Sequence, residues 1–233
     1  MGSEDKIILY TNHRCPWAHR AHITLAELNL PFEEVIIDLD VPRTAEYLAV
    51  NPRGLVPSIS FNGEIITESA IVAQFLVDSR PNHLVPQTGN AEAALRRARI
   101  AFFVDAFISG STKHLFKIAA AKTDAEAEEP AREALQQLVK EVEPLLADAK
   151  PFFGGSDKLT FAEVLTAPFA IRLLTLSKAG VYPKILAEQL PEKAPNFTKW
   201  AEKLSSHQSV VNIYREEDII RTAKARIAKL RAA

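Results

Sequence analysis

The chain has 233 residues, of which 47% are apolar and 24% charged, the composition of a folded globular protein. Its formal net charge of −1 supplies no global field for nucleic acid or for an anionic membrane surface, so we expect neither as a partner. Its single cysteine excludes an intramolecular disulfide scaffold and favours a reducing compartment.

The first third of the chain alternates short apolar runs with helical stretches. Residues 6–10 read as a buried strand and residues 18–28 as a helix. Residues 32–39 then read as a second strand, which completes a βαβ unit with parallel strands. The elements expected next are, in order, a short helix (43–49), a strand (55–61), a hairpin turn at Asn62-Gly63, an antiparallel strand (64–66) and a helix that starts at 67–69.

Beyond residues 81–90, which we expect to form a linker, every strong pattern is helical. The expected helices are 91–121 (as one segment or two), 124–148 (kinked or ended by Pro144), 160–178, 184–190, 195–205 and 216–230. Core candidates in the first of these are Leu95, Phe102, Phe103, Phe107 and Ile108. Thr160 and Glu163 have the spacing of a capping box, and the helix that follows is apolar nearly all round, so we expect it at the centre of a helical domain.

Cys15 has the strongest chemical signal in the chain. Pro16 suits the first position of a helix, which places Cys15 at or beside the N-cap. Unpaired backbone N–H groups and the helix dipole there favour thiolate over thiol. Ala18 occupies the fourth position, which excludes Cys-x-x-Cys dithiol exchange, so an outside thiol must resolve any mixed disulfide. A lone cysteine is otherwise commonly a small buried hydrophobic residue.

Three stretches give the chain a family resemblance: Cys15-Pro16-Trp17-Ala18, the seven residues from Asn51 to Pro57, and Glu68-Ser69-Ala70-Ile71. With the strand order and the capping box, they resemble the cytosolic glutathione S-transferases over nearly the full length. The similarity is to the cysteine-type classes, closest to omega, with the lambda and dehydroascorbate reductase classes also similar. The resemblance implies an α/β fold: a thioredoxin-like domain at 1–80, a linker at 81–90 and an all-α domain at 91–233.

The resemblance also implies how glutathione is held. The expected glutathione-binding residues are Trp17, Arg43, Val56, Pro57, Glu68 and Ser69. Val56 would pair with the ligand main chain before a cis Pro57, and the start of the helix at Glu68-Ser69 would take the γ-glutamyl group. Without the resemblance, Pro57 reads as an ordinary strand-start proline, Glu68-Ser69 as plain helix capping and Arg43 as a solvated side chain. For the second substrate we expect a pocket lined by helices after Asn90, with Phe107, His114 and Ile171 as guesses.

The function that follows is a glutathione-dependent thiol transferase or reductase with Cys15 as the catalytic nucleophile. It would act by deglutathionylation, dehydroascorbate reduction or a similar reaction, with glutathione as co-substrate and no metal. Two alternatives stay open: a non-catalytic scaffold or regulatory partner of the same fold, and a glutathione-conjugating transferase. We also expect a homodimer, to which the cluster Arg96-Arg97-Arg99 could contribute, and a cytoplasmic location, since residues 1–5 are polar and acidic.

Overall fold

The computed structural model describes residues 5–232, and the chain divides into two compact units, residues 1–82 and 83–233. The first unit is a thioredoxin-like α/β domain and the second is helical, as expected. The first unit contains β1 (Ile7–Thr11), α1 (Pro16–Glu27), β2 (Glu33–Ile36), α2 (Ala45–Val50), β3 (Ser58–Phe61), β4 (Glu64–Thr67) and α3 (Ser69–Asp78).

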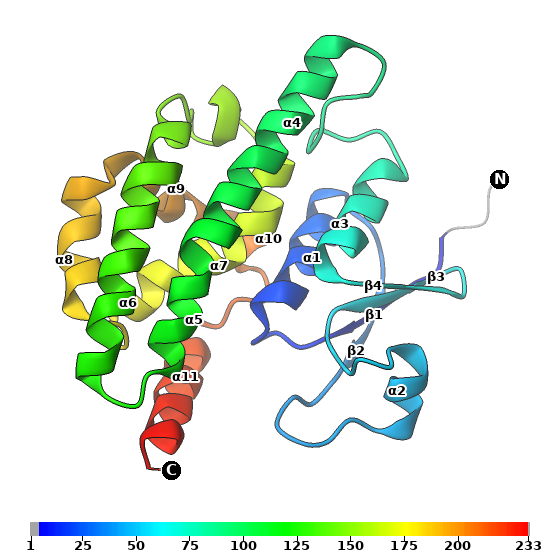
Figure 1. The fold of residues 1–233 in the computed structure, drawn as a ribbon. Helices are drawn as coiled ribbons and strands as arrows, with labels where there is room; N and C mark the ends of the chain where they lie inside the picture. The colour runs from blue at the N-terminus through cyan, green and yellow to red at the C-terminus, as the bar shows by residue number, and fades with distance from the viewer. Residues whose placement is uncertain (1–4, 233) are drawn as a thin grey trace. The chain divides into compact units, whose positions relative to one another are not determined.

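The four strands form one mixed sheet in the order β2-β1-β3-β4 (Figure 1). β1 pairs in parallel with β2 and antiparallel with β3, while β3 and β4 form the hairpin predicted at Asn62-Gly63. One face of the sheet packs on α1 and α3, which also pack on each other. The core there consists of Ile7, Leu9, Ala21, Leu25, Ile59, Val72 and Leu76.

Two strands are shorter than the sequence predicted. β2 covers only Glu33–Ile36 of the expected 32–39, and all four residues are exposed, because β2 is an edge strand paired only with β1. β3 starts at Ser58 rather than at Leu55. The carbonyl of Leu55 accepts hydrogen bonds from the Tyr47 hydroxyl and from Asn51 Nδ2. At the expected start of the strand, this carbonyl is therefore bonded to side chains.

The second unit consists of helices joined by short loops (Figure 1). They are α4 (Ala91–Asp105), η1 (Ala106–Thr112), α5 (Lys113–Ala120), α6 (Asp124–Gln137), η2 (Leu138–Val142), η3 (Glu143–Leu146), η4 (Phe153–Gly155), α7 (Phe161–Lys178), α8 (Lys184–Lys193), α9 (Pro195–Leu204), α10 (Gln208–Val211) and α11 (Glu216–Arg231). The short α10 was not predicted.

The helix α7 lies at the centre of this unit, as predicted. It packs against α4, α8, α9 and α11, and every residue from 161 to 177 is buried. The capping box is present: Thr160 Oγ1 accepts from the N–H of Ala162, and the Glu163 carboxylate accepts from the N–H of Thr160. A helix buried on all sides therefore begins at a fully hydrogen-bonded end.

The two long helices expected before α7 are each broken. Residues 91–120 pass through the π-helical η1, and residues 124–146 through the π-helical η2 and the 3-10 turn η3, which has Pro144 near its start. Phe103 and Phe107 are buried as predicted, but Leu95 and Phe102 are 52% and 59% exposed. The prediction was wrong for these two because α4 turns a different face inward, the one that carries Ala93, Ile100 and Phe103.

Candidate functional site

Cys15 is the N-cap residue of α1. Its backbone is extended (φ −78°, ψ 118°), and Pro16 begins the helix. The Cys15 N–H donates to the carbonyl of Asn12 at 3.0 Å, and the Cys15 carbonyl accepts from the N–H of His19 at 3.1 Å. The side chain is partly exposed. The sequence thus correctly placed the sulfur at a helix start with access to solvent, the setting that activates a thiolate.

Val56, the residue before Pro57, lies beside this sulfur. Cys15 Sγ is 3.8 Å from the Val56 carbonyl oxygen, and Cys15 packs against a small cluster that contains Ala18, Tyr47 and Val56. The peptide bond between Val56 and Pro57 is cis, as the resemblance implied. The structure therefore brings the cysteine stretch together with the Val-Pro stretch, 41 residues further along the chain.

Arg20 is a part of this site that the sequence analysis missed. It lies on α1, is only 4% exposed, and its guanidinium carbon lies 4.6 Å from the centre of the Trp17 ring. Burial lowers the pKa of Arg20 to about 10, and the charge of a Cys15 thiolate opposes that lowering. The attraction is mutual, so a buried cation favours the thiolate form of Cys15. The signal was available, because Trp17 and Arg20 are three residues apart and thus on one face of the helix.

Glu68 and Ser69 begin α3. Ser69 Oγ accepts a hydrogen bond from Arg20 Nη1 at 3.2 Å, so Arg20 links the start of α3 to the cysteine helix. Glu68 is the N-cap residue and has a positive φ of 69°, which is uncommon for a residue other than glycine and marks a constrained position. Its carboxylate pairs with Arg53 at 2.6 Å on an exposed surface.

Arg43 bonds to its own loop. Its Nε donates to the Gly54 carbonyl at 2.9 Å, and its Nη1 donates to the carbonyls of Asp38 and Val41, both at 2.6 Å. Gly54 has φ +63°, and a Cβ there would lie 3.0 Å from Arg43 Cγ, so the loop favours glycine at this position. These contacts give Arg43 a structural role, and its contact with glutathione stays a prediction.

The three residues guessed for the second-substrate pocket are all buried in the helical unit. Phe107 packs against Phe197 and Trp200, and Ile171 is 1% exposed on α7. His114 Nδ1 lies 2.8 Å from a carboxylate oxygen of Glu133. A hollow of about 660 Å³ does exist in this unit, but none of the three guessed residues lines it. Their role in substrate binding stays a prediction.

The site is that of a thioredoxin-like domain with a free cysteine at the start of α1. Residues 14–79 match the family model for the glutathione S-transferase N-terminal domain. The full chain has a TM-score of 0.83 to the crystal structure of rice GST1 in complex with glutathione, with 25% identity over 98% of this chain and 99% of that one. The chain is similar to glutathione S-transferases over nearly its full length.

Relatives from two classes share the similarity. The probable glutathione S-transferase GSTU1 of Oryza sativa is 27% identical, over 91% of this chain and 90% of its own length. The crystal structure of glutathione transferase Omega 2C from Trametes versicolor is 26% identical, with a TM-score of 0.81, over 96% of this chain and 99% of its own. Within residues 5–232, no helix is both long and apolar enough to cross a bilayer.

Proposed function

We propose that this protein is a glutathione-dependent thiol transferase of the cysteine type, similar to the omega class, in which Cys15 is the nucleophile. The observation that carries the proposal is the position of Cys15 at the N-cap of α1, with the Val56 carbonyl near its sulfur. Family members with a Ser or Tyr in the active site conjugate glutathione, whereas the residue at this helix start is a cysteine. Glutathione as co-substrate is supported by the complex of the rice relative.

The reaction would proceed in two exchanges. The Cys15 thiolate attacks the glutathionyl sulfur of a mixed disulfide, the S–S bond breaks, and the substrate thiolate leaves and takes a proton. Cys15 is then disulfide-bonded to glutathione. A second glutathione thiolate attacks the glutathionyl sulfur of that disulfide, which releases oxidised glutathione and restores the Cys15 thiolate. Overall, one mixed disulfide and one glutathione thiol give the substrate thiol and one molecule of oxidised glutathione. The number of disulfide bonds is unchanged, so no other reductant is needed.

The site residues have different proposed roles in this reaction. The N–H groups of α1 and the buried Arg20 stabilise negative charge on the sulfur. Val56 is proposed to pair with the main chain of glutathione, and Ser69 with Glu68 to receive its γ-glutamyl carboxylate and amine. Trp17, Pro57 and Arg43 are proposed to shape the pocket. Residues 1–80 would thus serve glutathione and residues 91–233 the second substrate, including Phe107, His114 and Ile171. A cytoplasmic location suits a lone thiol that has to stay reduced.

We also propose that the protein is a homodimer. Leu95 and Phe102 are exposed on α4, and their seven-residue spacing puts both on one face of the helix. Arg99 lies one turn from Phe102 on the same helix and is also exposed. We propose that this exposed apolar pair, with its charged neighbours, is part of the surface that the second subunit covers.

The test separates chemistry from binding. Cys15→Ser should abolish turnover of a glutathione mixed disulfide and leave calorimetric glutathione binding intact. Glu68→Gln should weaken binding about tenfold, since it removes a charge-assisted contact but also releases a weak surface pair with Arg53, while Cys15 still alkylates normally. Glu64→Gln is the matched control, because Glu64 is an exposed carboxylate on β4, and it should change neither measurement.

Three results would overturn the proposal in different ways. Full turnover by Cys15→Ser would show that another group is the nucleophile. Turnover of a chloro-aromatic electrophile in place of the mixed disulfide would favour the conjugating alternative. Failure of the unmutated protein to bind glutathione at millimolar concentration would favour the scaffold alternative.

A further inference from the structure

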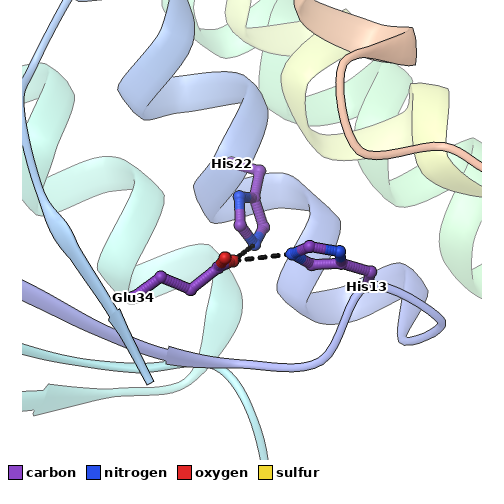
Figure 2. Close-up of side chains that lie close together, drawn as sticks. All are labelled: His13, His22 and Glu34. Carbon is purple, nitrogen blue, oxygen red and sulfur yellow. Dashed lines mark hydrogen bonds and ion pairs between the residues drawn. The ribbon is translucent and has the colours of Figure 1, made fainter. Parts of the chain in front are cut away.

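Three metal-ligating side chains converge in the first unit, outside the residues assigned to glutathione. His13 lies in the loop after β1, His22 on α1 and Glu34 on β2 (Figure 2). His13 Nε2 is 2.7 Å and His22 Nε2 is 3.4 Å from the same carboxylate oxygen, Oε1 of Glu34. The three ligand atoms all lie within 4.8 Å of one another. We propose that His13, His22 and Glu34 form a binding site for one zinc ion.

The spacing of the ligand atoms suits zinc. Tetrahedral zinc with bonds of 2.0–2.1 Å keeps its ligand atoms roughly 3.3 Å apart. The His22–Glu34 distance of 3.4 Å already has this value, and the His13–Glu34 distance of 2.7 Å has to open by about half an ångström. His13 is the ligand that can move, because its side chain is 41% exposed and lies in a loop.

The chemistry of the ligand set also suits zinc. Two imidazole nitrogens and one carboxylate form the ligand set of many catalytic zinc sites, with water in the fourth position. The Glu34 and His13 side chains are 32% and 41% exposed, so the ion and its water have a path from solvent. His22 is 2% exposed, and its ring packs in a T-shaped arrangement with Phe32, with the ring centres 5.8 Å apart.

A purely structural role is the competing explanation. The Thr11 hydroxyl lies 2.9 Å from His22 Nε2, so hydrogen bonds alone could satisfy this nitrogen and tie β1, α1 and β2 together. The two explanations predict different effects of added zinc. If the cluster binds zinc, the Thr11 hydroxyl competes with the ion for His22 Nε2, so Thr11→Val should raise the zinc affinity. If the cluster is only structural, these residues bind no zinc, and Thr11→Val should leave the response to added zinc unchanged.

The site does not rest on the proposed function, and the experiment keeps the two apart. Zinc chloride is titrated calorimetrically into tag-free Cys15→Ser protein, so that the thiol cannot be the ligand. We expect one ion per chain with micromolar or tighter affinity. His13→Ala and Glu34→Gln, which alter exposed side chains, should each weaken binding at least tenfold.

Matched controls lie close by. Glu33→Gln changes the adjacent residue of β2, whose side chain points to the opposite face of the sheet, and His83→Ala removes an exposed histidine of the second unit. Neither should alter the affinity. Cobalt(II) provides a second readout, since a tetrahedral site gives an intense visible absorption band that His13→Ala should abolish. Equal zinc affinity in His13→Ala, Glu34→Gln and the controls would overturn the proposal, as would zinc binding that is lost in Cys15→Ser.

Discussion

Glu163→Gln is the substitution that most directly tests how the helical unit is held together. The Glu163 side chain is fully buried and accepts four hydrogen bonds. Its Oε2 accepts from the N–H of Thr160 at 2.8 Å and from the Thr160 hydroxyl at 2.7 Å. Its Oε1 accepts from the N–H of Phe153 and from Trp200 Nε1, both at 2.8 Å. One carboxylate therefore links the start of α7 to η4 and to α9.

The cost of the substitution follows from these four bonds. Glutamine keeps an oxygen for Phe153 and Trp200, and the Thr160 hydroxyl can rotate to accept from the new amide. The N–H of Thr160 cannot, so one buried donor loses its acceptor at a cost of about 1–3 kcal/mol, and the other bonds lose their charge assistance. We expect a total loss of about 3 kcal/mol in the free energy of unfolding of this unit.

The assay uses the two tryptophans of the chain, Trp17 and Trp200. In a Trp17→Phe background, urea unfolding followed by fluorescence reports on Trp200 and thus on the helical unit alone. Thr160→Val keeps the backbone donor bonded and should cost about 1 kcal/mol, the usual loss for an N-cap side chain. Glu202→Gln removes an exposed carboxylate of α9 and should cost under about 1 kcal/mol. If Glu163→Gln costs no more than Glu202→Gln, the carboxylate does not organise this unit.

Three further outcomes are expected. The alkylation rate of Cys15 should rise with pH to a midpoint below about 8.5, the ordinary thiol value; a midpoint at or above it would contradict the helix-start argument. Burial raises the pKa of Tyr182 to about 12, so the protonated phenol stabilises the fold fully below pH 10. Between pH 10 and 12 the free energy of unfolding should fall by up to about 3 kcal/mol. Tyr182→Phe should remove this fall, and the same pH profile in the variant as in the unmutated protein would refute the prediction. Light scattering at micromolar concentration should give about twice the 25.8 kDa chain mass, and Phe102→Asp should shift it toward one chain; a monomer before the substitution would refute the dimer.

The sequence predicted best what is encoded locally. The order of strands and helices in the first unit, the N-cap position of Cys15 and the capping box at Thr160 each follow from a few adjacent residues. The structure has them as predicted. Burial of α7 was also predictable, because its apolar residues leave no polar face.

Features that depend on distant residues were missed. The inward face of α4 is set by its neighbours, so Leu95 and Phe102 were wrongly assigned to the core. The role of Arg20 depends on Ser69, 49 residues away, and the cluster at Glu34 joins three separate elements. Helical and strand periodicity carries no information about such pairings, whereas hydrogen-bond partners in the folded chain define them.

The complete burial of α7 has a consequence for how the second unit opens. A helix with a solvent-facing side can keep part of its structure when one neighbour detaches, but α7 exposes apolar surface whichever of α4, α8, α9 or α11 leaves it. Partial opening is therefore costly. The amide hydrogens of residues 165–175, apart from Pro168, which has none, should exchange with solvent only when the whole unit unfolds. In this unit, the last amides to exchange should report its global stability, while those of α11, mostly exposed and packed on few neighbours, should exchange by local fraying.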